Sequence, residues 1–423
     1  MGTVFPQGRG LRVWALGEML IDFTARESGV DVGAARSFEK NPGGAPANVA
    51  VAVARLGGRA GFVGCVGDDA FGRHLLGVLC AEDVDVRFAK ALSGAATSLA
   101  FVARRGGEPD YFFVRNPGAD TLLTPAMVDA VDLRRQDIVH LGSNSLAAEP
   151  IRSAVERMLL RVKGAGAALC FDVNLRPAFW ENAEDGEGRE SARSLCLHFA
   201  RQADVLKVNR DELAWLTGAD SVEDGLVGIA RLNDGVICCT LGADGVALIV
   251  PAHDGVRKDG REGDWESGRK GDRENGLDVD RESGRKGDRK NGRARAMVRV
   301  PGFQVQPVDA TGAGDALIGA LLFAIASGEK GVWGGVNGSP DESLLSERIG
   351  AGEGHADASA RCTFVDEGGW KERLAHISEE QWRDFAQFAC AAAACNIQER
   401  GAIGAMPVRG AVLQLLAASL SDK

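Results

Sequence analysis

Cysteines at the spacing of a metal-binding or redox motif are absent from this chain of 423 residues. Its nine cysteines contain no Cys-x-x-Cys spacing, and several, such as Cys170, Cys238 and Cys239, stand in apolar runs where a reduced thiol packs as a small hydrophobic group. We therefore expect a reducing compartment. No apolar stretch is long enough to cross a bilayer, and residues 1–12 contain no apolar signal core. The expectation is a cytoplasmic protein with no membrane partner.

Several catalytic and binding signatures are also missing. The chain has no Walker A motif, no strand–GxGxxG–helix unit and no Gly-x-Ser-x-Gly turn. A P-loop fold and a dinucleotide oxidoreductase are therefore disfavoured. The net charge of −10 disfavours nucleic acid as a partner. The 45% hydrophobic content is enough for a large buried core.

Short apolar runs alternate with amphipathic stretches of helix length. This alternation predicts an α/β fold, a doubly wound sheet with helices on both faces. Polar residues that follow the apolar runs are expected at the carboxyl ends of the strands, where such sheets bind ligands. The predicted strands are Val13–Leu20, Ile138–Leu141, Ala168–Asp172, Val205–Val208, Val236–Leu241 and Val246–Val250, and the predicted helices are Ala47–Leu56, Ala70–Cys80, Pro150–Val162 and Ala316–Ile325.

Three stretches depart from this pattern. Segment 97–117 alternates apolar and polar residues around a Gly-Gly turn, which predicts a β-hairpin. Residues 252–297 carry 13 basic and 11 acidic residues and almost no apolar ones, and Glu266–Arg273 recurs as Glu282–Arg289. We predict a disordered charged insertion there, with a docking or regulatory segment as the alternative. A second loop insertion is predicted over 332–369.

The most informative segment is Asp309–Asp315, which leads directly into an apolar helix. A glycine turn that opens a helix directs backbone N–H groups and the positive end of the helix dipole at one point, and so can hold an anion. Asp315 on the first helical turn would repel that anion. Its place there is explained if it takes a proton from a hydroxyl that attacks a phosphate. The alternative is a capped core helix in which Asp315 only complements the dipole.

A second glycine turn precedes another helix at residues 41–57. Gly43 and Gly44 expose backbone groups, and Asn48 lies on the first helical turn. Backbone groups and one amide together supply the donors and acceptors that sugar hydroxyls need. A plain packing helix after a glycine turn would have the same sequence.

Together the two segments resemble both signatures of the PfkB, or ribokinase-like, carbohydrate kinase family. The chain is most similar to the fructokinases of that family, since Gly17–Phe23, Arg115–Asp120 and Glu399–Ile403 also match. The resemblance covers residues 11–251, 298–330 and 381–410. It implies one ribokinase-like kinase domain over 11–423 with a small β-sheet lid, about 31–41 and 97–117, through which two copies form a homodimer.

The resemblance implies that Asp315 is the general base and that the amides of Gly312, Ala313 and Gly314 form the anion hole. ATP, Mg²⁺ and K⁺ are the implied cofactors. Glu212 would hold Mg²⁺ through water, and Asp309 and Thr311 would help bind the monovalent cation. The residues expected on the nucleotide side are Lys207, Asn209, Thr240, Gly242 and Gly245.

Each of these positions has a simpler structural interpretation. Asn209 can cap a helix, Lys207 can end a strand, and the loop at Thr240 can be an ordinary hairpin turn. Asp309 and Thr311 can bond each other to fix their turn. On the sugar side the implied contacts are Asp22, Gly43, Gly44, Asn48, Phe101, Arg115 and Arg176.

The implied reaction is phosphorylation of the 6-hydroxyl of D-fructose. A 2-keto-3-deoxygluconate kinase is the alternative within the family, and a non-catalytic scaffold is the alternative outside enzymes. Cys390 and Gly404 depart from residues common in fructokinases, near the side where adenine is expected. The residues at the predicted catalytic positions match the family pattern.

Overall fold

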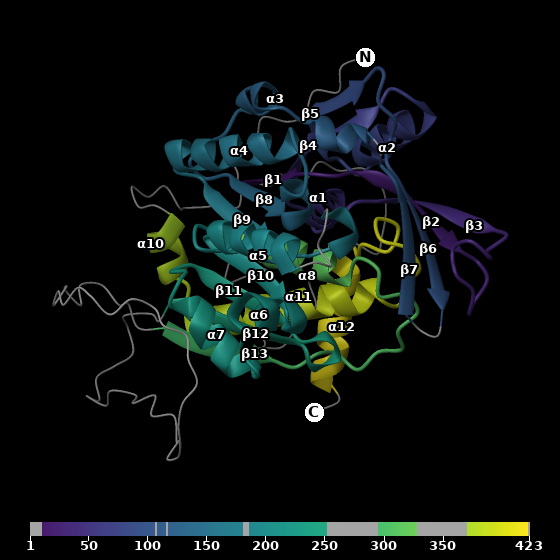
Figure 1. Cartoon of the computed structure of the whole chain (residues 1–423). Helices are drawn as coiled ribbons and strands as arrows, with labels where there is room; N and C mark the ends of the chain where they lie inside the picture. The colour runs from purple at the N-terminus through teal and green to yellow at the C-terminus, as the bar shows by residue number, and fades with distance from the viewer. Residues whose placement is uncertain are drawn as a thin grey trace, which may run out of the picture.

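The computed structural model describes residues 11–105, 108–115, 117–180, 186–251, 295–327 and 370–421 (Figure 1). A nine-stranded sheet forms its centre, in the order β13-β12-β11-β10-β9-β8-β1-β4-β5. The seven strands from β11 to β5 are parallel, and β12 and β13 are antiparallel to their neighbours. The strands are β1 Arg12–Leu16, β4 Arg59–Gly67, β5 Asp85–Leu92, β8 Ile138–Gly142, β9 Ala168–Asp172, β10 Val205–Asn209, β11 Val236–Thr240, β12 Val246–Pro251 and β13 Arg295–Val300.

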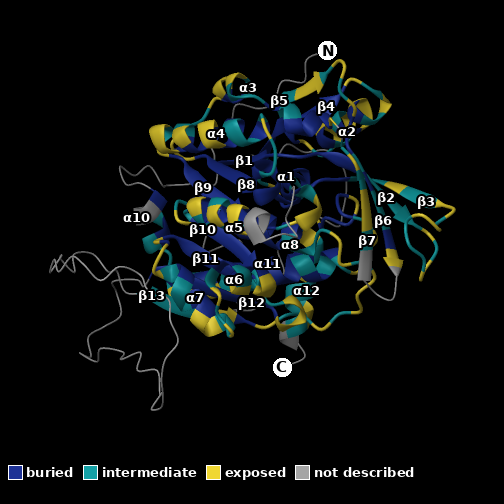
Figure 2. Ribbon diagram, in the orientation of Figure 1, coloured by how far each residue is buried: buried dark blue, intermediate teal, exposed yellow. Residues whose placement is uncertain are grey.

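The strands of this sheet are apolar on both faces because helices cover both (Figure 2). In β1, Val13 and Ala15 pack into one core while Trp14 and Leu16 pack into the other. The first core includes α1 Ala45–Arg55, α2 Ala70–Ala81, α8 Ala313–Ser327, α10 Trp370–Ala375, α11 Glu379–Asn396 and α12 Arg409–Ser421. The second includes α3 Pro125–Asp129, α4 Ile151–Ala165, α5 Gly186–Ala200, α6 Arg210–Thr217 and α7 Val222–Ala230. The predicted doubly wound α/β fold is confirmed.

A second, four-stranded sheet stands to one side of the molecule in the order β3-β2-β6-β7 (Figure 1). Its strands β6 and β7 form the hairpin expected from the sequence, with Leu99 paired to Val114. More of this sheet is exposed than of the large one (Figure 2). The strands are β2 Leu20–Ala25, β3 Phe38–Gly43, β6 Leu99–Arg105 and β7 Glu108–Val114.

One predicted strand boundary near this sheet was wrong. The predicted strand Val13–Leu20 is two strands in different sheets, because the chain leaves the large sheet at Gly17. Gly17 has φ +147°, and a Cβ there would lie 2.7 Å from the Pro46 side chain, so only glycine fits this crossover. In the predicted lid segment 31–41, strand β3 begins at Phe38.

The predicted insertions fall mostly outside the described residues. The repeat Glu266–Arg273 lies there, as does all of 332–369. The predicted end of the charged segment was wrong by three residues, because Arg295, the first residue of β13, already pairs with Pro251 of β12. Within the described ranges, no helix has the length and apolar character that a bilayer span needs.

Candidate active site

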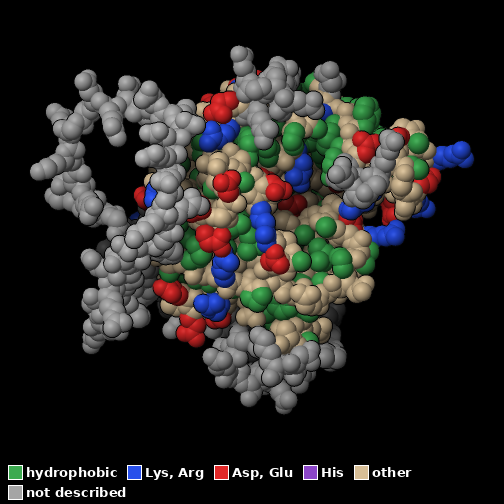
Figure 3. All heavy atoms as spheres, turned by 60° about the horizontal axis from the view of Figure 1, so that its bottom comes forward, with side chains coloured by type: hydrophobic (Ala, Val, Ile, Leu, Met, Phe, Trp, Pro, Cys, Tyr) green, Lys and Arg blue, Asp and Glu red, His purple; other side chains and the backbone are tan. Residues whose placement is uncertain are grey.

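A cavity of about 350 Å³ opens between the small sheet and the carboxyl edge of the large sheet. This volume is within the range of small-molecule sites. The space-filling view shows a hollow with acidic side chains deep inside it and basic ones beside it (Figure 3). Predicted residues that line the cavity are Asp22, Gly44, Asn48, Arg176, Asp309, Thr311, Gly312 and Asp315.

Asp315 and Asn48 meet inside this cavity although 267 positions separate them. The Asn48 amide, on the first turn of α1, donates a 2.7 Å hydrogen bond to Oδ2 of Asp315, on the first turn of α8. Asp315 is buried, and burial raises its pKa to about 7, opposed by the Asn48 hydrogen bond. A carboxyl group with this pKa can accept a proton near neutral pH.

The turn before α8 brings backbone amides and a buried cation to the same point. Gly312 has φ +82°, a conformation that favours glycine. A Cβ on Gly314 would lie 3.2 Å from Nζ of Lys207, so the lysine is directly beside the first turn of α8. Ala313 is the first residue of that helix. The N-terminus of α8 therefore combines helix dipole and lysine charge.

Lys207 forms a buried ion pair with Asp172 of the neighbouring strand. Its Nζ lies 2.9 Å from Oδ1 of Asp172, and the two side chains are 6% and 2% exposed. Burial alone would lower the pKa of Lys207, but the charges of Asp172 and Glu212 raise it above its usual range. Lys207 is therefore a permanently charged group held under the α8 turn.

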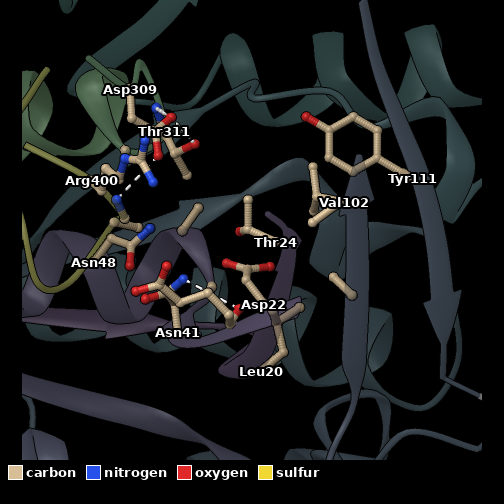
Figure 4. Close-up of a pocket in the computed structure, with 18 of the residues that line it drawn as sticks. Leu20, Asp22, Thr24, Asn41, Asn48, Val102, Tyr111, Asp309, Thr311 and Arg400 are labelled. Atoms are coloured by element: carbon tan, nitrogen blue, oxygen red, sulfur yellow. Dashed lines mark hydrogen bonds between the residues drawn. The ribbon is translucent and has the colours of Figure 1, made fainter. Parts of the chain in front are cut away.

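Asp22 projects from β2 into the cavity, on the side facing the segment of Asp309 and Thr311 (Figure 4). Burial, and after it the charge of Asp315, raise the pKa of Asp22 to about 7. Gly43 makes room for this carboxylate, because a Cβ there would lie 2.0 Å from Oδ2 of Asp22. Gly44 has φ +106° and lies where a Cβ would meet the backbone oxygen of Glu18 at 2.5 Å. Both glycines are thus required by close approach.

Two of the predicted sugar contacts, Phe101 and Arg115, are not among the described residues that line the cavity. Phe101 lies on the outer face of the small sheet, stacked on Phe23 at 5.0 Å. The inner face carries its neighbours in β6, Ala100 and Val102.

Arg115 is held by Asp120, to which its Nε donates at 2.8 Å, and its guanidinium lies 4.3 Å from the ring centroid of Phe179. The aromatic residues that do line the cavity are Tyr111, Phe113 and Phe179.

The predicted nucleotide residues gather at the carboxyl ends of β10 and β11, outside this cavity. Asn209 pairs with Thr240 in the sheet register. Gly242 and Gly245 follow with φ +63° and +92°. A Cβ on Gly245 would lie 2.1 Å from the backbone oxygen of Val300, which explains that glycine by packing.

Asn209 and Glu212 form a capping box at the start of α6. Glu212 N donates to the Asn209 side chain at 2.8 Å, and Asn209 N donates to Oε2 of Glu212 at 2.8 Å. Oε1 of Glu212 accepts from the amide of Leu175 at 2.9 Å. Each Glu212 oxygen keeps one lone pair for a water molecule, so the residue fits an outer-sphere role toward Mg²⁺ and not direct coordination.

Asp309 accepts hydrogen bonds that hold its own turn and the loop at Gly401. Its Oδ1 accepts from the Thr311 amide at 3.1 Å and hydroxyl at 2.7 Å, and its Oδ2 accepts from Gly401 N at 3.1 Å. Nη2 of Arg104 also lies 3.4 Å from Oδ1. A monovalent cation beside Asp309 fits this anionic turn but would share it with Arg104.

The described residues contain no group of three or more His, Cys, Asp and Glu side chains able to hold a metal ion. Of the two residues that depart from the fructokinase pattern, Cys390 is 4% exposed and packs in the core. Gly404 has open surroundings, since a Cβ there would meet nothing closer than 3.9 Å.

Sequence reasoning missed several cavity residues. Glu18 stands in the matched segment Gly17–Phe23 but received no role, and Asn144 and Asn174 follow β8 and β9 as polar residues at strand ends. Their position directly after apolar strands was the available signal. Phe179 carried none, because it comes from a single short turn of 3-10 helix, Pro177–Phe179.

Comparison with known proteins places the chain in a family. Residues 11–258 match the model described as "pfkB family carbohydrate kinase", so the chain belongs to the pfkB family carbohydrate kinases. It is 42% identical over 320 residues to Fructokinase-1 of Oryza sativa subsp. japonica, covering 75% of this chain and 84% of that protein. It is 36% identical to Fructokinase-1 of Zea mays, covering 97% and 98%.

Solved structures of kinases are similar over most of the chain. A fructokinase double mutant from Vibrio cholerae O395 with bound fructose, ADP and potassium ion gives a TM-score of 0.67 at 26% identity, covering 96% of this chain and 98% of that one. A fructokinase from Xylella fastidiosa with bound ATP gives 0.66 at 27% identity, with coverage of 96% and 98%. The chain is an ATP-dependent sugar kinase with the ribokinase-like fold, and its partners are small molecules.

Proposed function

We propose that this kinase transfers the γ-phosphoryl group of ATP to the 6-hydroxyl of D-fructose. The observation that carries the proposal is the Asn48–Asp315 pair, which holds a carboxyl group of raised pKa at the N-terminus of α8, inside the cavity that Asp22 also lines. The relatives named as fructokinases, and the fructose bound to one similar structure, support fructose as the sugar.

In this mechanism Asp315 accepts the proton of the sugar hydroxyl as the oxygen bonds to the γ-phosphorus. The bond from that phosphorus to the bridging oxygen breaks, and ADP leaves with the electron pair. The amides of Gly312, Ala313 and Gly314 stabilise the charge on the transferred group, and Lys207 adds a fixed positive charge beneath them. Asn48 orients the Asp315 carboxylate through its hydrogen bond.

The sugar is bound between the small sheet and α1. Asp22 accepts hydrogen bonds from two sugar hydroxyls, and the backbone at Gly43 and Gly44 allows the sugar close approach. Arg176 lines the same cavity and lowers the pKa values of Asp22 and Asp315, which burial raises.

ATP binds along the rim where β10 and β11 end, with Asn209, Thr240, Gly242 and Gly245 beside it. Mg²⁺ would offset the phosphate charge when bound, and Glu212 would hold it through water. Asp309 and Thr311 would help hold K⁺ next to the α8 turn.

A substrate panel tests the assignment. We expect the purified chain to release ADP with D-fructose, and less efficiently with D-ribose or 2-keto-3-deoxygluconate, in a coupled assay with and without K⁺. Phosphorus NMR of the product should place the phosphate on carbon 6. Turnover of 2-keto-3-deoxygluconate alone would assign the alternative activity within the family, and no turnover of any sugar would favour the scaffold.

The proposed base gives an expected pH profile. Below pH about 7 we expect kcat/KM for fructose at saturating MgATP to fall by about tenfold or more per pH unit, because protonated Asp315 cannot accept the hydroxyl proton. Asp22 titrates in the same range, so the slope should lie between one and two. Steady-state rates across that range measure it. A profile that stays flat well below neutral pH would contradict the role of Asp315.

We also propose that two copies associate through the outer face of the small sheet. Phe112 and Val114 of the edge strand β7 are 56% and 45% exposed, and Phe112 continues a row of rings formed by Phe23 and Phe101. Clustered exposed aromatic side chains mark protein interfaces.

Phe112→Asp should therefore convert a dimer into a monomer, because a charge would be buried in the contact. Light scattering after gel filtration measures the mass. Leu160→Asp is the control, since Leu160 on α4 is 61% exposed on a different element. A monomeric wild-type chain, or an F112D variant of unchanged mass, would disprove the interface.

The eight free cysteines in the described residues suit a reducing compartment, and we propose the cytoplasm.

A further inference from the structure

Two buried oxygen atoms in the cavity have no hydrogen-bond donor. Glu18 lies in the crossover from β1 to β2, and Asn144 lies in the short helix that follows β8; both line the cavity and are 3% and 4% exposed. The Asn144 amide nitrogen donates to Oε1 of Glu18 at 3.3 Å. This bond leaves Oε2 of Glu18 and Oδ1 of Asn144 unpartnered.

Buried acceptors of this kind are almost always satisfied in folded proteins, and an exception calls for a missing partner. Glu18 and Asn144 line a cavity that is open to a ligand, so a molecule bound beside these two side chains can supply the donors. Each needs an O–H or N–H group. A sugar hydroxyl provides one. An ionised carboxylate provides none, and it would come close to the buried carboxyl groups of Asp22 and Glu18.

Glu18 and Asn144 line the same cavity as Asp22 and the proposed base Asp315. Besides burial, the charges of Asp315 and Glu18 both raise the pKa of Asp22. Asp22 is therefore close enough to respond to both carboxyl groups. A ligand that spans the cavity from Asp315 past Asp22 can reach Glu18 and Asn144.

We propose that Glu18 and Asn144 bind sugar hydroxyls other than the one that is phosphorylated, and that they select a neutral sugar over a sugar acid. This inference rests on the proposed function, because it assumes that a sugar occupies the cavity. It gives a role in substrate choice to two residues that come from different connections, 126 positions apart.

Substrate analogues that each lack one hydroxyl test the contact. We expect Glu18→Ala and Asn144→Ala to raise KM for fructose about 10- to 100-fold while kcat changes little, because the lost bonds exist before and during the transfer. With one of the deoxyfructoses, KM of the wild type should rise by a similar factor relative to fructose. KM of the variants should rise little further with that analogue. Such non-additivity shows that the side chain and the missing hydroxyl are partners.

Glu18→Gln tests the selection against acids. It keeps the size of the side chain and replaces the carboxyl group by an amide that can donate a hydrogen bond to a ligand carboxylate, so the ratio of kcat/KM for 2-keto-3-deoxygluconate to that for fructose should rise. Glu156→Gln, on the exposed side of α4, is the matched control and should change neither value. The binding constant for ATP, measured by calorimetry, should stay unchanged in all variants that fold.

Two results would overturn the proposal. If each deoxyfructose raises KM by the same factor in the wild type and in the variants, no sugar hydroxyl contacts this pair. If KM for fructose is unchanged in Glu18→Gln and Asn144→Ala, the pair has no part in binding. Should Glu18→Ala fail to fold, these two milder variants decide the question. Absence of any fructose turnover in the wild type would instead reject the proposed function.

Discussion

Replacing Asp315 by asparagine should lower kcat for fructose by about 10²- to 10⁴-fold, the usual contribution of a general base. Asparagine has nearly the same shape and can still accept the hydrogen bond from Asn48, but it cannot take up the hydroxyl proton. Steady-state kinetics at saturating MgATP, with the ATP binding constant measured separately, would show the loss and its cause.

The fold should survive this substitution. Because burial raises the pKa of Asp315, ionised Asp315 destabilises the folded state above the pKa of the unfolded chain, and a neutral asparagine removes that penalty. At pH about 8 the melting temperature should therefore be unchanged or higher. Glu379→Gln, an exposed first-turn acid on α11, is the control with normal activity. Turnover by D315N within a few-fold of the wild type would remove Asp315 from its role.

Lys207→Met should have the largest effect on stability and also reduce turnover. It leaves Asp172 buried without its cation, at a cost of about 3–5 kcal/mol in the free energy of unfolding. It also removes the positive charge beside the first turn of α8, so kcat should fall by about 10²- to 10³-fold. Urea denaturation and steady-state kinetics measure the two effects.

A double variant separates these two roles. In Lys207→Met with Asp172→Asn, the Asp172 charge is removed together with its paired cation, so most of the lost stability should return while kcat stays low. Lys163→Met, at an exposed position on α4, controls for loss of a lysine. Recovery of both stability and turnover in the double variant would show that Lys207 serves only to neutralise Asp172.

The large sheet could be predicted from the sequence because parallel strands covered on both faces are continuous apolar runs. Ala168–Asp172 was predicted to the residue, and Val205–Asn209 and Val236–Thr240 to within one. The α8 turn could be predicted because glycines and an aspartate directly before an apolar helix form a compact pattern that is typical of an anion site. Local signals of this kind need no knowledge of distant segments.

The small sheet and its contacts could not be predicted in the same way. Alternation in β6 shows that Ala100 and Phe101 point to opposite faces, but not which face covers the cavity. That choice depends on how the chain leaves the large sheet at Gly17, between β1 and β2. The partners of Arg115 are Asp120 and Phe179, and an isolated arginine in the sequence does not indicate them.

Pairs that are distant in the sequence were the hardest to foresee. Asn144 and Glu18 are 126 positions apart, and Lys207 meets Asp172 only because β10 pairs with β9. One sequence gives each residue a place at a strand end, but it gives no distances between them. The cavity with its buried acids therefore required the structure.

The most direct test is a structure of the chain with D-fructose and a non-hydrolysable ATP analogue. The account predicts a carboxylate oxygen of Asp315 within about 2.6–3.2 Å of the fructose 6-hydroxyl, with the terminal phosphate at the N-terminus of α8. Fructose bound outside this cavity, or bound with its 6-hydroxyl turned away from Asp315, would contradict it.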